Sequence, residues 1–294
     1  MHGSFAVFEA LGIEKTFNVS NTVFFPEYLQ FLDIDAMKYK IPSFIFAEPR
    51  RFKTDKMKRT IKEIKNDYKV TGDNPYNNLF KNEIENKEKS SLEDLFREIK
   101  YHFINQHPIG NFEGYPENDK IVYIGGFVVE KNETLLEKIS EEKPECVVLL
   151  AFGTIHTTRI SEIMGKHKNL SVMFQIFEKN PQCQYTVKLD KEFLPEKYDE
   201  SIIHVTEEDI PQKDILGEYL RIKNFNRLEA LYAGVPLICI PIAGDQFYNS
   251  SLVENLGIGK YVALLLRKDD GKEFPYLKFI KDFEDAFNKI MKNE

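Results

Sequence analysis

The chain has 294 residues, of which 42% are hydrophobic, and a formal net charge of −7. This length suggests about two domains, and the 24 Phe and 14 Tyr residues provide ample apolar surface for hydrophobic cores. The acidic balance argues against a nucleic-acid-binding protein, because that class relies on Lys and Arg to release counterions from phosphates. No stretch reaches the roughly eighteen apolar residues of a membrane span, and no signal peptide is visible, so we expect neither an anchor nor a leader.

The three cysteines, Cys146, Cys183 and Cys239, do not have the spacing of a metal site. Cys146 and Cys239 stand beside or within apolar runs, where a free thiol usually behaves as a small buried hydrophobic side chain. We therefore predict buried thiols, with no disulfide framework and no metal site.

The first part of the chain, residues 1–118, has too few strand signals for a complete domain. Its Lys-rich run at residues 53–69 is interrupted by acidic residues, which predicts a solvated helix face. Ser90 and Glu93 have the spacing of a capping box. They predict a helix whose apolar face is made of Leu95, Phe96, Ile99 and Phe103. Residues 108–117 are rich in Gly and Pro and indicate a linker.

The second part, residues 119–294, alternates short apolar runs with amphipathic stretches, which is typical of βαβ units. The expected strands are residues 121–124, 146–152, 185–189, 202–205, 237–242 and 261–266. The expected helices are residues 135–141, residues 157–179, one from Gln212, and one opened by the capping box of Ser251 and Glu254 and stopped by Gly257. Part of 157–179 also alternates as a strand does, so both assignments stay open there. We predict the α/β class, with a doubly wound Rossmann-like domain in this half and an incomplete Rossmann-like domain before it.

The most informative stretch is residues 229–249, which predicts a helix end, a tight stop, a buried strand and then a polar loop. Gly234 suits the left-handed conformation that ends a helix, and residues 237–242 are apolar as in strands of a parallel sheet. Asp245 and Gln246 follow that strand. Ligands of open α/β sheets bind beyond the carboxyl ends of the strands, so these two side chains are candidates for a polar-ligand site. From the pattern alone, an ordinary surface turn is the favoured alternative.

This stretch resembles the signature of the UDP-glycosyltransferases, and more narrowly of the animal UDP-glucuronosyltransferases. The shared features are the Glu-Ala-Leu helix end, the Gly-Val-Pro turn, the apolar strand, and Gly-Asp-Gln followed by Asn. The similarity continues in the same order through residues 5–12, 120–126, 147–154 and 210–216. It implies a GT-B-type fold, in which residues 119–294 form the UDP-sugar (donor) domain and residues 1–118 are part of the acceptor-side domain.

The resemblance implies a donor-binding site made of Gly153, Thr154, Gln212, Glu229, Asp245 and Gln246. The Gly-Thr pair would lie against a phosphate, because a residue without Cβ lets the backbone approach closely. The glutamine of the Pro-Gln dipeptide would meet the uracil edge, the glutamate would bind the ribose hydroxyls, and the Asp-Gln pair would bind the sugar hydroxyls. The implied donor is UDP-glucuronic acid or UDP-glucose, without a metal or a further cofactor. For each residue taken singly, a helix cap or a surface position is the alternative.

The chain also departs from the family pattern. The His-Cys/Gly-Gly-x-Asn-Ser turn that the family places at the diphosphate has no counterpart, because residues 221–225 run almost directly into residues 226–229. Asp209 stands where the family has a Trp that stacks on uracil, and such stacking is worth roughly 1–3 kcal/mol per base. The catalytic His of the family and its Asp partner precede the segment that residues 5–12 match. We therefore name no catalytic residue.

Taken together, the resemblance predicts a UDP-glycosyltransferase that acts on hydroxyls of small lipophilic acceptors, truncated at both ends, with an internal deletion, and impaired or inactive. The family resides in the endoplasmic reticulum membrane, on its lumenal face. The alternatives are a non-catalytic Rossmann-like partner of full-length relatives, a nucleotide-binding remnant, and a gene fragment without a stable product. The expected partners are the UDP-sugar and its acceptor, and no nucleic acid.

Overall fold

The structure, a computed structural model, describes residues 2–44, 47–49, 58, 61–62, 90–126, 146–151, 169–208, 220–223, 234–267 and 272–292. The chain divides into two compact units: residues 1–47 with 51–125, and residues 48–50 with 126–294. Within the described ranges, no helix is long and apolar enough to cross a membrane.

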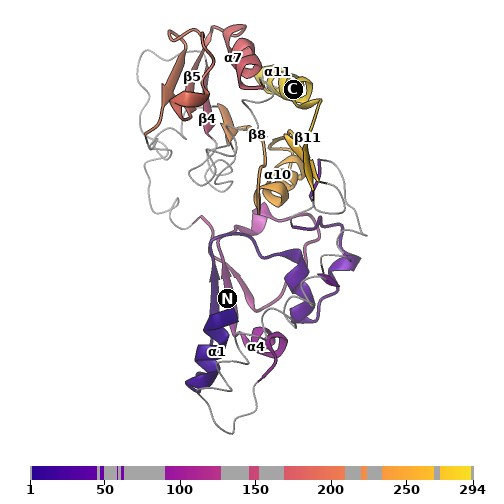
Figure 1. The fold of residues 1–294 in the computed structure, drawn as a ribbon. Coiled ribbons are helices and arrows are strands. Elements are labelled where there is room, and N and C mark those ends of the chain that lie inside the picture. The colour runs from indigo at the N-terminus through magenta and orange to yellow at the C-terminus, as the bar shows by residue number, and fades with distance from the viewer. Residues whose placement is uncertain are drawn as a thin grey trace. The chain divides into compact units, whose positions relative to one another are not determined.

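The first unit contains a small parallel sheet with short helices packed on it (Figure 1). Its elements are α1 (His2–Ala10), β1 (Phe17–Ser20), the 3₁₀ helices η1 (Pro26–Leu32) and η2 (Ala36–Lys38), α4 (Leu92–Glu98), β2 (Tyr101–Ile104), the 3₁₀ helix η3 (Pro108–Gly110) and β3 (Ile121–Tyr123). The strands pair in the order β1-β2-β3, all parallel. Leu29 and Phe31 of η1 pack with Phe96 of α4 and Ile104 of β2 to form the core of this unit.

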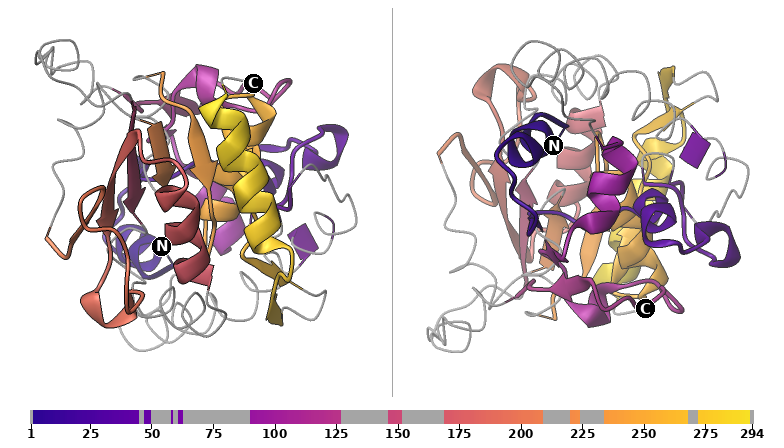
Figure 2. Two further views of the ribbon diagram at one scale, coloured as in Figure 1. Left: turned by 90° about the horizontal axis from the view of Figure 1, so that it is seen from above. Right: turned by 90° about the horizontal axis from the view of Figure 1, so that it is seen from below.

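The second unit is built on a larger sheet that the views in Figure 2 show from both ends. Its elements are β4 (Cys146–Ala151), α7 (Asn169–Glu178), β5 (Cys183–Lys188), η5 (Lys191–Phe193), β6 (Ile203–Thr206), β7 (Leu220–Lys223), β8 (Leu237–Cys239), α10 (Gln246–Asn255), β9 (Gly259–Tyr261), β10 (Leu265–Arg267), β11 (Glu273–Pro275) and α11 (Phe279–Met291). Strands β10 and β11 form a separate antiparallel pair.

The six strands of the larger sheet are all parallel and lie in the order β6-β5-β4-β7-β8-β9. Numbered along the chain from β4, this is the order 3-2-1-4-5-6 of dinucleotide-binding Rossmann folds. The direction of winding reverses between β4 and β7, which are neighbours. The predicted α/β class with a doubly wound Rossmann-like domain is confirmed.

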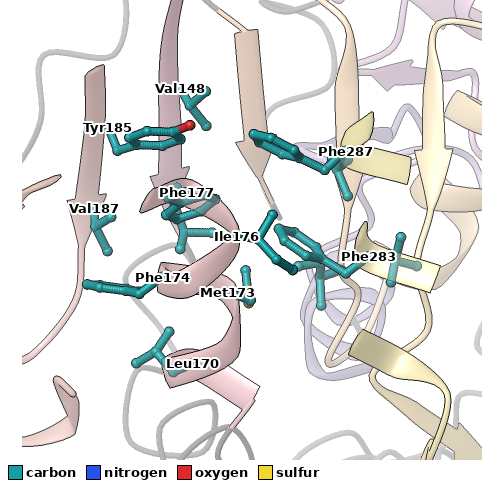
Figure 3. Packing of buried hydrophobic residues seen from close by; sticks show 14 of the residues in the cluster. Val148, Leu170, Met173, Phe174, Ile176, Phe177, Tyr185, Val187, Phe283 and Phe287 are labelled. Atoms are coloured by element: carbon teal, nitrogen blue, oxygen red, sulfur yellow. The ribbon is translucent and has the colours of Figure 1, made fainter. Parts of the chain in front are cut away.

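Two helices, α7 and α11, contribute the aromatic core of the second unit (Figure 3). The ring of Phe177 stacks on Tyr185 of β5, with centroids 4.4 Å apart, and lies 6.3 Å from Phe283 and 5.9 Å from Phe287 of α11. Residues 169–178 form the helix α7, so the helical interpretation of residues 157–179 is confirmed for this part. Residues 157–168 lie outside the described residues. Burial of these rings fixes α7 and α11 against the sheet that carries the candidate site.

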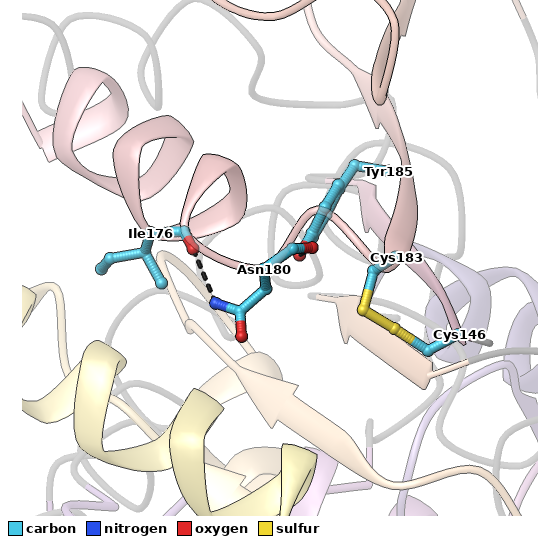
Figure 4. Close-up of a disulfide and its surroundings, with 5 residues drawn as sticks. All are labelled: Cys146, Ile176, Asn180, Cys183 and Tyr185. Atoms are coloured by element: carbon cyan, nitrogen blue, oxygen red, sulfur yellow. Dashed lines mark hydrogen bonds between the residues drawn. A yellow bond between two sulfur atoms is a disulfide. The ribbon is translucent and has the colours of Figure 1, made fainter. Parts of the chain in front are cut away.

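Cys146 and Cys183 form a disulfide, which contradicts the prediction of buried free thiols (Figure 4). The two residues are direct partners in the register of β4 and β5, and their Cα atoms are 4.6 Å apart, within the range that a disulfide spans. The sequence could not reveal this pairing, because it depends on which strands are neighbours. Cys239 is 8% exposed, in agreement with the prediction for that residue.

Local predictions in the first unit need correction. Helix α4 is capped by Ser91, whose Oγ accepts a hydrogen bond from the backbone N–H of Asp94 at 3.1 Å, so the N-cap serine lies one residue later than predicted. Phe103 belongs to β2 and not to the helix. The predicted linker at residues 108–117 is packed into the unit: Phe112 is 3% exposed and the Tyr115 hydroxyl donates to Phe24 O.

The sequence analysis assigned β3 to the second part of the chain, but this strand pairs with β2 in the first unit. In this pairing, Ile121 of β3 lies opposite His102 of β2. The compact units accordingly divide after residue 125, whereas residues 118 and 119 marked the boundary in the sequence analysis.

In the second unit, α10 begins at Gln246, so Ser251 lies inside the helix and is 6% exposed; the predicted capping box at Ser251 and Glu254 is wrong. The predicted stop at Gly257 is confirmed, with a φ of +71°. The strand expected at residues 261–266 is divided between β9 and β10. The helices expected at residues 135–141 and from Gln212 lie outside the described residues.

Candidate functional site

The candidate site is the loop between β8 and α10. After β8 the chain remains buried, with Ile240 at 1% and Ile242 at 0% exposure. It then turns at Gly244, whose φ is +58°, a conformation that glycine adopts without the steric cost of a Cβ. Asp245 occupies the N-cap position of α10, and Gln246 is the first residue of the helix. The two polar side chains are therefore held between a buried strand end and a helix start.

The side chain of Gln246 folds back onto this loop. Its Oε1 accepts hydrogen bonds from the backbone N–H groups of Ile242 at 2.8 Å and Ala243 at 3.1 Å. The backbone N–H of Gln246 in turn donates to Ala243 O at 3.2 Å. One amide oxygen thus closes the loop by two hydrogen bonds.

Asp245 is oriented by a residue one turn along α10. Asn249 donates from Nδ2 to Asp245 Oδ2 at 3.2 Å, and the backbone N–H of Asn249 donates to Asp245 O at 2.9 Å. Both side chains are partly buried. The sequence analysis named Asn249 only as part of the shared motif and did not predict its contact with Asp245, although the i, i+4 spacing is the one at which helical side chains meet.

Strand β8 pairs with β7, and β7 pairs with β4. The loop therefore follows the strand next to β7, one of the two strands between which the direction of winding reverses. Because all these strands are parallel, their carboxyl ends share one edge of the sheet. Asp245 and Gln246 lie together at this edge. Gly153, Thr154, Gln212 and Glu229 lie outside the described residues.

The described part of the chain contains no group of three or more His, Cys, Asp or Glu side chains that could hold a metal ion. At the described part of the candidate site, the Asp245 side chain lies beside the start of α10, whose N–H groups favour anions or hydroxyl oxygens.

The first unit has a separate cavity of about 330 Å³. It is lined by Phe31, Leu32, Asp33, Arg97, Asn118, Asp119 and Lys120. The last three of these residues directly precede β3, so the cavity lies toward the amino end of that strand. Arg97 and Asp33 approach each other to 3.5 Å, and cationic and anionic groups are balanced in the lining. Nucleotide sites of α/β sheets lie at the opposite, carboxyl edge.

Among the residues of the first unit that the structure describes, the titratable side chains of His102 and Glu27 are buried. His102 of β2 is 0% exposed, and burial, with a smaller contribution from Lys120, lowers its pKa to about 4. Glu27 of η1 is also 0% exposed, and burial raises its pKa although Ser43 and the backbone N–H of Phe44 donate to its Oε1. Both groups face the core of the unit.

Comparison with known proteins gives no matching family model. The chain is 30% identical over 196 residues to an ecdysteroid UDP-glucosyltransferase of Lacanobia oleracea granulosis virus, covering 62% of this chain and 39% of that protein. It is 23% identical over 269 residues to a Caenorhabditis elegans protein named as a UDP-glucuronosyltransferase, covering 87% of this chain and 49% of that protein. The chain thus spans half or less of the length of these relatives.

A solved structure of the glycotransferase of kitacinnamycin matches 98% of this chain and 71% of its own, with a TM-score of 0.57 and 16% identity. At this identity the likeness concerns the fold, and it agrees with the Rossmann-like sheet order found in the second unit. In sequence the chain is similar to UDP-glycosyltransferases, and its fold is that of the GT-B glycosyltransferases.

Proposed function

We propose that the chain is a UDP-glycosyltransferase that transfers glucuronic acid or glucose from a UDP-sugar to a hydroxyl of a small lipophilic acceptor. The observation that carries this proposal is the position of Asp245 and Gln246, which follow β8 at the carboxyl edge of a sheet with the Rossmann strand order. Nucleotides bind at this edge in such sheets. The names of the relatives support the reaction class and the UDP donor.

The proposed donor site consists of Gly153, Thr154, Gln212, Glu229, Asp245 and Gln246. Gly153 and Thr154 follow closely on Ala151, the last residue of β4, the strand at which the winding reverses. Backbone N–H groups at that place would meet the diphosphate. Asp245, on the other side of β7, would accept hydrogen bonds from sugar hydroxyls. This order along the sheet edge fits an extended UDP-sugar.

The reaction we propose is an inverting displacement: the acceptor hydroxyl attacks the anomeric carbon, a base takes its proton, and the bond from that carbon to UDP breaks on the opposite side. We propose that this chain performs it slowly. Strand β7 ends at Lys223, and the sequence from there to Glu229 has no counterpart of the His and Gly residues that the family places at the diphosphate. Loss of one such donor in an enzyme lowers the rate by about 10²–10³.

We also propose that the chain acts in the lumen of the endoplasmic reticulum. The Cys146–Cys183 disulfide supports this proposal, because disulfides persist in oxidising compartments. We further propose that the chain associates with a full-length relative. Reduced thiols in protein isolated from cells would count against the location, and failure to co-purify with any relative would count against the partner.

The function is tested by calorimetric titration of the purified chain with UDP-glucose and UDP-glucuronic acid, followed by an assay of UDP release with phenolic acceptors. We expect saturable binding and slow turnover. Asp245→Ala and Glu229→Ala should each weaken binding by about tenfold, as expected for losing hydrogen bonds to a charged group. Asp285→Ala, on the exposed side of α11, is the matched control and should bind as the unchanged chain does. A folded chain that binds neither sugar nucleotide would refute the proposal.

A further inference from the structure

Gln246 stands where the proposed function expects a contact with the sugar, yet its amide oxygen is already used inside the protein. Oε1 accepts from the N–H groups of Ile242 and Ala243 at 2.8 and 3.1 Å, which are ordinary hydrogen-bond lengths. Of the two ends of the amide, only the Nε2 group is left to face a ligand, and no described residue accepts a hydrogen bond from it.

The loop that Gln246 closes is fixed at both ends. Ile242 is fully buried in the core of the second unit, and Gly244 makes the left-handed turn that leads into α10. Between them, the N–H groups of residues 242 and 243 point to one side-chain oxygen instead of to a strand partner. Asp245 comes directly after this closed turn, so the direction of its Cα–Cβ bond depends on the turn.

We propose that Gln246 is a positioning residue of the donor site. Its amide oxygen sets the backbone of residues 242–244, and thereby the placement of the Asp245 carboxylate toward a sugar hydroxyl. The identity of the ligand in this inference rests on the proposed function. The conformation of the loop rests only on the hydrogen bonds from Ile242 and Ala243 to Gln246 Oε1. The Nε2 group adds a donor that suits an oxygen acceptor of the ligand, such as a hydroxyl.

Two substitutions separate positioning from direct contact. Gln246→Glu keeps an oxygen that can accept from both N–H groups and removes the Nε2 donor. Gln246→Leu removes both. Gln184→Leu, at a glutamine of β5 that contacts the exposed His204, is the control for loss of a partly exposed glutamine. The ratio of the affinities for UDP-glucose and UDP is the readout, because UDP alone measures any general change in charge or folding.

If Gln246 positions the loop, Gln246→Leu should lower this ratio by about tenfold, the effect of one to two hydrogen bonds, and Gln246→Glu should restore most of it. Equal loss in both variants, or no loss in either, would overturn the proposal.

Amide hydrogen exchange of Ile242 and Ala243 tests the loop without a ligand: protection should be kept in Gln246→Glu and lost in Gln246→Leu. Unchanged protection in Gln246→Leu would refute positioning, whereas a chain that binds no UDP but shows the expected exchange would refute only the proposed function.

Discussion

Asn18 of β1 donates a hydrogen bond from Nδ2 to Nδ1 of His102, its register partner on β2, over 3.2 Å. The imidazole is fully buried, with the rings of Phe24 and Phe96 centred 5.1 and 5.0 Å from it. Since Nδ1 accepts, the neutral ring carries its hydrogen on Nε2, which has no hydrogen-bond partner among the described residues. A charged imidazolium is strongly disfavoured at this place.

The first prediction is that the first unit loses stability in mild acid. The pKa of His102 is lowered to about 4 in the folded unit and is about 6.5 in an unfolded chain. The folded state therefore binds fewer protons between these values, and the contribution to stability is fully present above pH 6.5 and is lost as the pH falls toward 4. The loss should approach about 3 kcal/mol.

This effect is measured by urea unfolding at several pH values. Hydrogen exchange of peptides that contain β2 reports the unfolding of the first unit. His102→Phe fills the same aromatic core without a titrating group, so its stability should change less over the same pH range. A first unit that is equally stable at pH 4 and pH 7 would contradict the assignment.

The second prediction concerns Glu27, which is buried with a raised pKa. Glu27→Gln keeps the oxygen that accepts from Ser43 Oγ at 2.7 Å and from Phe44 N at 2.8 Å, and it removes the ionisable group. The pKa of Glu27 is higher in the folded unit than its unfolded value of 4.5. The folded unit therefore loses stability as the pH rises from the unfolded pKa through the folded pKa, because the Glu27 carboxyl group then ionises more readily in the unfolded chain. The substitution should therefore stabilise the first unit at pH 8 more than at pH 4. Thermal unfolding at the two pH values checks this, with the exposed Glu113→Gln as control; an equal shift at both pH values would speak against it.

The third prediction is that reduction destabilises the second unit. The Cys146–Cys183 disulfide joins residues separated by 37 positions, and closing a loop of this size in the unfolded chain stabilises by about 2–4 kcal/mol. Adding a reductant should lower the unfolding midpoint of the unchanged chain and of Cys239→Ser, and should not affect Cys146→Ser. Native alkylation of Cys146 and Cys183 without reductant would show that the bond does not form.

The fourth prediction tests the packing of β9 against β8 at the amino ends of these two strands. A Cβ on Gly259 would meet Leu237 O, and it would lie 2.7 Å from Val253 Cγ1. Leu237 is the register partner of Gly259 in the pairing of β8 with β9. Gly259→Ala should cost about 1–3 kcal/mol, the usual effect of overpacking, measured by urea unfolding. Lys260→Ala should have a much smaller effect, and equal stability of the two variants would refute the close packing.

Much of the second unit could be predicted from sequence because most residues of its strands β4 and β8 are buried on both faces. Val148, Leu150 and Ile238 belong to nearly continuous apolar runs, which mark central parallel strands. The start of α10 was misjudged because Ser251 and Glu254 offer a local capping signal that tertiary packing overrides.

Two features could not be predicted. The pairing of Cys146 with Cys183 depends on the register of strands that are far apart in sequence. The use of the Gln246 oxygen depends on a turn whose backbone follows from the buried Ile242. Sequence spacing carries information about neither. The resemblance could therefore indicate candidate site residues, but the geometry of the loop that carries Asp245 and Gln246 required the structure.

The most direct test of the donor site is to locate bound nucleotide by anomalous diffraction from crystals of the chain grown with a bromouracil analogue of UDP. We predict one bromine position at the carboxyl edge of the larger sheet, on the side of Thr206 at the end of β6, because the uracil is expected to meet Gln212. A bromine position in the first unit, or at the amino ends of the strands of this sheet, would contradict this prediction.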